Sequence, residues 1–327
     1  MQRIRVLNAG DIRGSVTMRE CIEVMKTAFE LLSAGKSLVP QRRVMEIAPA
    51  DGRLLIMPAF AAKYQYAGLK LVSLFQENPA RGLPLIQAVM LLVDALDGRI
   101  RALLDGEALT ALRTGGASGL ATDFLARKDA KTAAIFGAGV QAETQLAAIC
   151  AVRPIQKVLI FGRNRKKNAD FVRRMQDRFE ITALLAKSPE QLRGVHIICT
   201  ATTASTPVFS DAHIAAGVHI NGVGSYRANM REVPGETVKR AKVIVDHRAA
   251  CLAEAGDIVI PIQQAQINEK HIFAELGEVV SGTRKGRILP GEITFFKSVG
   301  NALQDLALAR HVFQTAEKLN LGQLIKL

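Results

Sequence analysis

The sequence predicts an α/β protein in which a unit of alternating strands and helices is inserted between the two ends of an α+β unit. Closely spaced strand-like runs fill the first third of the chain, and a strand–helix–strand rhythm begins at Lys131. A long amphipathic segment then follows Gly291. We place the first unit at residues 1–120, completed by about residues 300–327, and the inserted unit at residues 121–299.

The first unit is expected to combine one helix with a sheet. Thr17 is a suitable N-cap for a helix that ends near Leu32, with apolar side chains at helical spacing. Strand-like runs follow at residues 43–47, 53–57, 66–75 and 86–94. Such close spacing favours an antiparallel or mixed sheet over βαβ units. Residues 106–127 then predict a long helix whose glycines require close packing or a ligand beside them.

The inserted unit is expected to hold a parallel sheet covered by helices. Strand-like runs lie at residues 133–136, 157–161, 181–184, 196–200, 219–223 and 243–245. Segments with helical apolar periodicity, such as residues 144–152 and 168–179, separate some of them. After Gly291 a strand-like piece leads into a helix long enough to return to the first unit.

Residues 131–144, KTAAIFGAGVQAET, contain the most informative motif of the chain. A short apolar strand leads through Gly137, Ala138 and Gly139 into the start of a helix. The first glycine permits a tight turn, and the second lets the backbone approach phosphate groups. Ala142 is the small residue required for close helix packing. The motif predicts a dinucleotide site in a Rossmann unit, although glycines also mark ordinary strand-to-helix turns.

The end of the strand at residues 157–161 indicates which dinucleotide is bound. NAD enzymes usually place an acid here against the ribose 2′-hydroxyl. This chain has Arg163, Asn164 and Arg165 instead. Arginine can pair with a 2′-phosphate, so NADP(H) is favoured and NAD(H) remains possible. The alternative is an ordinary polar surface loop.

Two further strand ends carry small residues where an open α/β sheet binds its ligand. The strand at residues 196–200 continues as CTATTASTP, and the one at residues 219–223 as NGVGS. Small side chains there would let the backbone lie against a flat nicotinamide ring. Plain turn chemistry would also account for each segment taken alone.

Composition argues against several other classes of protein. The net charge is +13, but Lys and Arg are scattered and Trp is absent, so nucleic-acid binding is not expected. The four cysteines form no C-x-x-C pair and predict reduced thiols in a cytoplasmic protein. No signal peptide and no apolar run near the ~20 residues of a membrane span is evident. Glu275 and Glu278 lack further metal ligands nearby, so no metal is expected.

The whole chain resembles the ornithine cyclodeaminase/mu-crystallin family. The matching segments, in the family's order, are LLIMPAF, GLKLVSLFQEN, LLDGEALTALRTGGASGLAT, IFGAGVQA, INGVGSYRANMREV, IFAELGEVVSG and ITFFKSVGNALQDLA. The resemblance implies a homodimer in which the first domain pairs between subunits. It also implies a cleft between the two domains that holds NAD(P)(H) and a small amino or imino acid.

The resemblance also implies site residues. Arg43, Lys70 and Arg113 match the family's cations for the substrate carboxylate and are the expected catalytic residues. Arg42 points the other way from Arg43 and could take its role. Further substrate contacts are expected at Met57, Tyr226 and Arg227. Cofactor contacts are expected at Thr114, Gly137, Ala138, Gly139, Val140, Gln141, Arg163, Asn164, Arg165, Thr200, Ala201, Thr202, Val223, Gly224, Ser298, Val299 and Gly300.

Two departures from the family's cyclodeaminases narrow the expected activity. Leu55 and Tyr226 stand where those enzymes carry a Glu and an Asp, so ring closure of ornithine lacks its acid/base groups. The mu-crystallin-like branch fits better and implies NAD(P)H-dependent reduction of cyclic or linear imino acids of the ketimine, pyrroline-2-carboxylate or piperideine-2-carboxylate type. Lys70, whose apolar strand should lower its pKa, or a water molecule would set the protonation of the imine. Alternatives are an alanine-type amino acid dehydrogenase, an ornithine cyclodeaminase, or a non-catalytic NADPH-bound binding protein.

Overall fold

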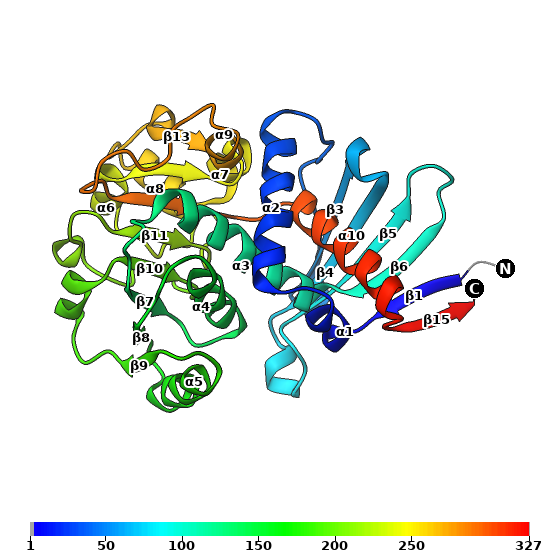
Figure 1. The fold of residues 1–327 in the computed structure, drawn as a ribbon, viewed down its shortest axis with the longest axis horizontal. Helices are drawn as coiled ribbons and strands as arrows, with labels where there is room; N and C mark the ends of the chain where they lie inside the picture. Colours follow the sequence, from blue (N-terminus) through cyan, green and yellow to red (C-terminus); the bar gives the residue numbers. More distant parts are fainter. Residues whose placement is uncertain (1–2, 327) are drawn as a thin grey trace. The chain divides into compact units, whose positions relative to one another are not determined.

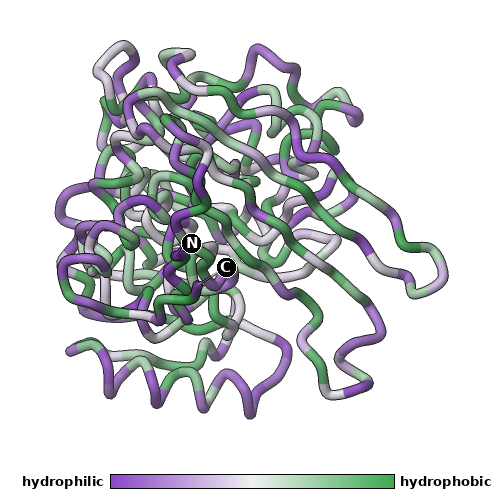
Figure 2. The backbone as a smooth tube through the Cα atoms, turned by 90° about the vertical axis from the view of Figure 1, so that its right-hand side faces the viewer, coloured by the Kyte–Doolittle hydropathy of each residue, from purple (hydrophilic) through white to green (hydrophobic). Residues whose placement is uncertain are grey.

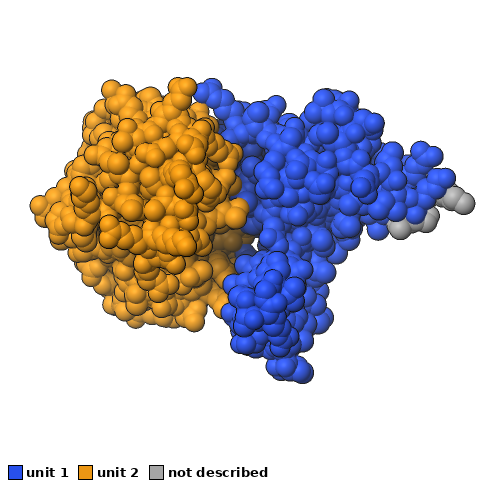
Figure 3. All heavy atoms as spheres, turned by 90° about the horizontal axis from the view of Figure 1, so that it is seen from below, with its two compact units in different colours: residues 1–113, 301–327 blue, residues 114–300 orange. Residues whose placement is uncertain are grey.

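The computed structural model describes residues 3–326 and divides into two compact units. Unit 1 comprises residues 1–113 and 301–327, and unit 2 comprises residues 114–300 (Figure 3). The first boundary between the units, after Arg113, lies within helix α3 (Gly106–Leu125). The sequence placed this boundary at residue 120, further along the same helix. The α/β fold with an inserted Rossmann-type unit is confirmed.

Unit 1 contains a mixed sheet of seven strands in the order β15-β1-β6-β5-β4-β3-β2. The strands are β1 (Arg3–Leu7), β2 (Arg43–Ile47), β3 (Gly52–Ala61), β4 (Tyr66–Phe75), β5 (Ile86–Asp94), β6 (Ile100–Asp105) and β15 (Gln323–Lys326). Only the β1–β6 pair is parallel among these neighbours. β3 is longer than the sequence predicted, and β1, β6 and β15 were not predicted.

Helix α10 (Ala302–Leu319) packs on one side of this sheet, α2 (Met18–Ser33) packs on α10, and α1 (Ala9–Gly14) lies beside β1 and β6 (Figure 1). Thr17 is the N-cap of α2, as predicted, and forms a capping box with Glu20. α10 packs directly on β4 because Gly68 has no side chain. A Cβ there would lie 2.3 Å from the Met90 side chain and 3.1 Å from that of Leu306 in α10.

Unit 2 contains a parallel sheet of eight strands in the order β13-β12-β14-β11-β10-β7-β8-β9. These strands are β7 (Thr132–Phe136), β8 (Lys157–Phe161), β9 (Thr182–Leu185), β10 (Ile197–Thr200), β11 (His219–Gly222), β12 (Lys242–Val245), β13 (Ile272–Glu275) and β14 (Thr294–Lys297). The helices wholly within the unit are α4 (Val140–Val152), α5 (Arg165–Arg178), α6 (Gly235–Arg240), α7 (Arg248–Glu254), α8 (Gly256–Gln263) and α9 (Leu276–Val280).

Apolar side chains fill both faces of the unit 2 sheet. Ala134 and Ile198 belong to one buried cluster, whereas their neighbours Ala133 and Ile197 belong to the other. This alternation places successive side chains on opposite faces, as in a sheet with helices on both sides. Short 3₁₀ helices complete the chain at Ala48–Ala50, Ala62–Tyr64, Asn78–Arg81, Pro189–Gly194, Asp211–His213 and Glu269–His271.

Candidate active site

Lys70 lies on the inner face of the unit 1 sheet among apolar neighbours. In the strand register it is opposite Met57 in β3 and Met90 in β5, so the three side chains share one face. Lys70 is only 2% exposed. Burial lowers the pKa of its ammonium group to about 8, against an opposing effect of Asp305. Lys70 is therefore still protonated at neutral pH, but it loses its proton far more easily than a surface lysine.

Asp305, in the first turn of α10, joins Lys70 to Arg113. Its Oδ2 lies 2.6 Å from Lys70 Nζ, and its Oδ1 lies 3.2 Å from Arg113 Nε. Arg113 Nη1 also donates to Gln304 Oε1 at 3.0 Å. Lys70 Nζ lies 3.4 Å from the Thr110 hydroxyl in α3, one helical turn before Arg113. We call Lys70, Arg113, Gln304 and Asp305 the cationic cluster.

The cationic cluster carries one surplus positive charge. It contains two cations and one carboxylate, and Lys70, Arg113 and Asp305 are 2%, 6% and 0% exposed. Burial by itself would raise the pKa of Asp305, but the charges of Lys70 and Arg113 outweigh it and lower that pKa. The carboxylate is therefore ionised at neutral pH. A buried surplus charge is costly unless an ion of opposite sign joins it, so this cluster suits a small carboxylate.

Arg43 is not part of this cluster, which corrects the expected set of three converging cations. It is exposed and lies opposite Ile56 in the register, whereas Lys70 is opposite Met57. Since successive strand residues alternate between faces, Arg43 lies on the other face of the sheet from Lys70. Arg42, which is half-buried, is among the charges that lower the pKa of Lys70. Arg42 is therefore the better candidate for the third cation.

Leu55 lies on the same face as Lys70, two residues from Met57 and opposite Val72. This is the position at which the cyclodeaminases of the resembling family were expected to carry a glutamate. The face around Lys70 thus presents Leu55, Met57 and Val72, with no carboxylate among these three. These three positions therefore offer no carboxylate for amine deprotonation.

The glycine turn of unit 2 has the geometry that a pyrophosphate requires. Gly137 has φ of +111°, and a Cβ there would lie 2.6 Å from the Ala201 carbonyl oxygen. Gly139 is the N-cap of α4, with no side-chain hydrogen bond to the helix and nothing within 4 Å of an added Cβ. The first N–H groups of α4 therefore have no side-chain cap, as at helix ends that bind anions. Ala142 is fully buried, as the third small position of the motif requires.

The residues after β8 are exposed and basic. Arg163 and Arg165 are both exposed, and Asn164 begins α5 by accepting a hydrogen bond from the backbone of Lys167 at 2.9 Å. Asn164 Oδ1 is thus occupied by the helix cap, while the two arginines remain at the carboxyl end of the strand. No acid lies between residues 162 and 167. A 2′-phosphate would meet attraction here rather than repulsion.

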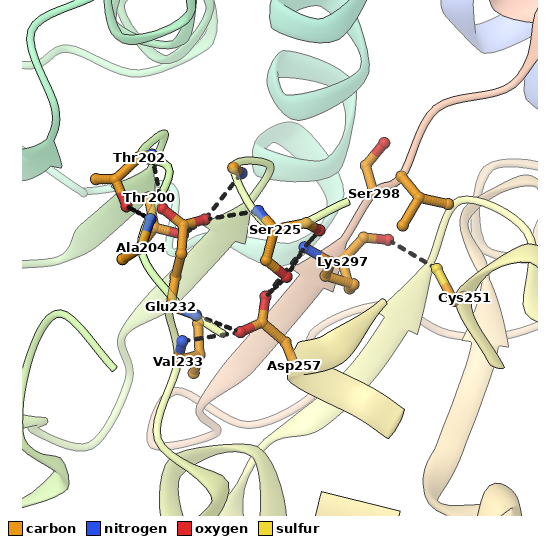
Figure 4. Close-up of polar contacts among 12 residues, drawn as sticks. Thr200, Thr202, Ala204, Ser225, Glu232, Val233, Cys251, Asp257, Lys297 and Ser298 are labelled. Atoms are coloured by element: carbon orange, nitrogen blue, oxygen red, sulfur yellow. Dashed lines mark hydrogen bonds and ion pairs between the residues drawn. The ribbon is translucent and has the colours of Figure 1, made fainter. Parts of the chain in front are cut away.

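Glu232 fixes the loops that follow β10 and β11, as Figure 4 shows. Its carboxylate accepts hydrogen bonds from the Thr200 hydroxyl (2.9 Å) and from the backbone N–H groups of Thr202 (2.7 Å), Gly224 (2.8 Å) and Ser225 (3.1 Å). Burial and the nearby Asp257 raise its pKa. One buried side chain therefore positions two of the strand ends that were expected to contact the cofactor.

Two more buried carboxylates support the same edge of the sheet. Asp257 accepts hydrogen bonds from the Ser225 hydroxyl at 2.8 Å and forms an ion pair with Lys297 at 3.0 Å (Figure 4). Asp246 accepts from the Ser298 hydroxyl at 2.8 Å and from the backbone of Gly300 at 2.7 Å. The segment from Ser298 to Gly300, expected to contact the cofactor, is therefore held rigidly after β14.

The other expected contacts of unit 2 lie in α3, in α4 and after β11. Thr114, in α3, accepts a long hydrogen bond of 3.4 Å from Gln145 in α4. Val140 is exposed at the first position of α4. Tyr226 and Arg227 follow β11, and the Arg227 guanidinium lies over the Tyr226 ring at 5.3 Å. The contacts expected between these two residues and a substrate stay predictions.

Sequence reasoning did not single out Gln304, Asp305, Glu232, Asp246 or Asp257. The sequence did carry one signal for Asp305: a carboxylate inside an apolar helical pattern, which would be buried and would therefore require a charged partner.

Glu275 and Glu278 form the capping box of α9. No group of His, Cys, Asp or Glu suited to a metal ion occurs among residues 3–326. Within that range no helix has the length and apolar character to cross a bilayer.

The inserted parallel sheet and its glycine turn define a two-unit protein of the Rossmann dinucleotide class. The sequence profile of the ornithine cyclodeaminase/mu-crystallin family matches residues 3–320, and the chain belongs to this family. Similar proteins in the family carry the names of reductases and dehydrogenases.

The Δ1-pyrroline-2-carboxylate reductase of Bacillus cereus is 39% identical over 98% of this chain and 99% of its own. The corresponding reductase of Thermococcus litoralis, solved in complex with NADH and L-proline, is 41% identical. Its TM-score is 0.94, over 98% of this chain and all of its own. An archaeal alanine dehydrogenase dimer with bound NAD is 32% identical, with a TM-score of 0.93 and complete coverage of both chains.

Proposed function

We propose that this protein is an oxidoreductase that reduces the C=N bond of a small imino acid with a nicotinamide dinucleotide. The substrates would be cyclic imines such as pyrroline-2-carboxylate and piperideine-2-carboxylate, or linear ketimines. The observation that carries the proposal is the cationic cluster, whose surplus charge calls for a carboxylate. The reductase relatives at 39% and 41% identity support the same substrate class.

Lys70 and Arg113 would hold the substrate carboxylate. Arg113 offers a planar fork of donors, and Lys70 offers a compact point charge. Asp305 bonds to both and keeps them oriented. Arg42 would add a third positive charge at the rim of this face. Binding energy at the carboxylate would thus fix the position of the adjacent imine carbon.

Reduction of C=N requires one hydride and one proton. When bound, the nicotinamide dinucleotide supplies the hydride. Lys70, with its pKa lowered to about 8, or a water molecule beside it would keep the imine nitrogen protonated. A protonated imine carries positive charge and accepts hydride more readily than a neutral one.

The residues of unit 2 fit the cofactor. Gly137 permits the tight turn and its close approach to the Ala201 carbonyl, and no side chain caps the first N–H groups of α4, which would bind the pyrophosphate. Arg163 and Arg165 favour NADP(H) over NAD(H), while the solved relatives contain NADH or NAD. Arg163→Glu should raise the KM for NADPH far more than that for NADH, and equal effects on both would contradict the preference.

The three alternative functions are amino acid dehydrogenase, ornithine cyclodeaminase and cofactor storage. The alanine dehydrogenase relative supports reductive amination of a 2-oxo acid through its imine as a second candidate. Ornithine cyclisation is disfavoured, because Leu55 and Tyr226 provide no carboxylate at the expected positions. A purely cofactor-storing role leaves the cationic cluster without a purpose.

The protein is also expected to form a homodimer through the outer face of the unit 1 sheet. Met45, Leu71 and Val89 are 53%, 38% and 38% exposed on that face. Figure 2 shows hydrophobic residues recurring along strands of this sheet. Exposed apolar surface of this kind is typical of subunit interfaces. Leu71→Asp should yield monomers in light-scattering measurements.

The four free cysteines favour a cytoplasmic location.

The function can be tested with a panel of substrates. Purified protein would be assayed with NADPH or NADH and pyrroline-2-carboxylate, piperideine-2-carboxylate, or pyruvate with ammonia. The reverse assay would use NAD(P)+ with ornithine, proline and alanine. Imine-dependent oxidation of the reduced cofactor is expected. Rapid ammonia release from ornithine without imine reduction would overturn the proposal.

A further inference from the structure

The amide of Gln304 has one satisfied end and one unsatisfied end. Its Oε1 accepts a hydrogen bond from Arg113 Nη1 at 3.0 Å. Its Nε2 has no hydrogen-bond partner among the described residues, and the residue is only 1% exposed. Gln304 therefore presents a buried, unused donor within the cationic cluster.

The orientation of this amide is fixed by chemistry. Arginine can only donate, so the atom that faces Arg113 must be the oxygen. A flipped amide would bring two donors together. The free N–H group is bonded to the same carbon as Oε1, so it lies next to the guanidinium. A buried donor without a partner is costly, and an acceptor on a ligand would remove that cost.

The charge of the cluster indicates which acceptor this is. Lys70 and Arg113 outnumber Asp305 by one positive charge, so an anionic oxygen is favoured over a carbonyl oxygen. Gln304 contributes a donor without adding charge. A glutamate at this position would instead cancel the surplus positive charge and repel an anion.

We infer that Gln304 is a substrate-binding residue whose Nε2 donates a hydrogen bond to the carboxylate of the imino acid held by Lys70 and Arg113. This inference rests on the proposed function. The contact from Gln304 would select substrates that carry a carboxylate on the imine carbon. An imine that carries an amide in that place would lose both the charge attraction and the best acceptor.

Two substitutions separate this role from a merely structural one. Gln304→Glu keeps an oxygen for Arg113 but removes the N–H donor. Gln304→Met removes both and keeps a similar length. If Gln304 served only to orient Arg113, the added charge of Gln304→Glu would weaken binding of the anionic inhibitor, but the affinity for the neutral pyrrole-2-carboxamide would be unchanged; loss of the Nε2 donor weakens binding of both ligands. The matched controls are Gln314→Glu and Gln314→Met, at a half-buried glutamine near the other end of the same helix.

The measurements are KM and kcat for pyrroline-2-carboxylate, the inhibition constant of pyrrole-2-carboxylate, and the dissociation constant of NADPH. Gln304→Glu should raise the KM and the inhibition constant about 10- to 100-fold, the scale of a lost hydrogen bond to a charged group with added repulsion. NADPH affinity should change less than about twofold. The inhibition constant should fall again at lower pH, because a protonated glutamate regains a donor.

The results also distinguish a failure of this inference from a failure of the proposed function. Wild-type protein that reduces imines while Gln304→Glu binds the inhibitor normally would overturn the role of Gln304 alone. Wild-type protein that reduces no imine would overturn the proposed function. If wild-type protein reduces no imine but binds pyrrole-2-carboxylate tightly, and Gln304→Glu does not, the carboxylate contact of Gln304 is still supported. If wild-type protein neither reduces imines nor binds the inhibitor, the proposed function and the role of Gln304 are both overturned. Thermal melting curves verify that each variant folds.

Discussion

Lys70→Met removes one of the two buried cations and changes the cationic cluster from a net charge of +1 to zero. Arg113 and Asp305 then neutralise each other, and the substrate carboxylate loses the attraction that favours its burial. Removing one partner of a buried, hydrogen-bonded charge pair costs about 2–5 kcal/mol. At about 1.4 kcal/mol per factor of ten, kcat/KM should fall by roughly 30-fold to several thousandfold.

The pH dependence of kcat/KM gives the same residue an independent signature. Burial lowers the pKa of Lys70 to about 8. Below that pH the ammonium group is charged and binds the carboxylate, and above it the charge is lost. Wild-type kcat/KM should therefore be level near neutral pH and decline as the pH rises through about 8. This decline should be missing in Lys70→Met.

The assay is steady-state reduction of pyrroline-2-carboxylate by NADPH over about pH 6 to pH 10, corrected for the pH behaviour of the imine itself. Lys63→Met, at a lysine exposed on the surface of unit 1, is the matched control and should behave as wild type. A Lys70→Met protein with normal kcat/KM, or one that keeps the decline near pH 8, would refute the reasoning.

Three further predictions concern the residues that support each site. Asp305→Asn leaves Lys70 and Arg113 buried without their carboxylate, so the free energy of unfolding should fall by about 3–5 kcal/mol in denaturant titrations, against almost no change for the exposed Asp97→Asn. Glu232→Ala frees the loops after β10 and β11 and should raise the dissociation constant of NADPH at least about tenfold, whereas unchanged cofactor affinity would dismiss its positioning role. Gly137→Ala combines positive φ with a clash at Ala201, so nucleotide binding should be abolished, and a variant that binds NADPH normally would show that the turn is not the pyrophosphate site.

Much of the fold could be predicted because its signals are local. The glycine turn, the capping box at Thr17 and the apolar strands of unit 2 each depend on neighbours within a few residues. β1, β6, β13 and β15 were not predicted, although β6 is longer than β2, which was. β1 pairs with β15 across almost the entire chain. Such pairings depend on the closed fold rather than on local pattern.

The candidate site shows the same limit at the level of single side chains. Lys70 and Arg113 could be chosen because a charge among small and apolar residues is conspicuous in sequence. The choice between Arg42 and Arg43 depended on strand register, which a shift of one residue reverses. Asp305 and Gln304 could not be paired with Lys70 and Arg113 from sequence, because they are brought together by the packing of α10 on β4 at Gly68.

The most direct test of the central claim is the fate of the hydride. The protein would be incubated with pyrroline-2-carboxylate and NADPH carrying deuterium at the transferable position of the nicotinamide, and the amino acid product would be examined by mass spectrometry and NMR. The proposed function predicts proline with one deuterium at its α-carbon. Proline without deuterium, or no proline at all with a folded and cofactor-bound protein, would contradict it.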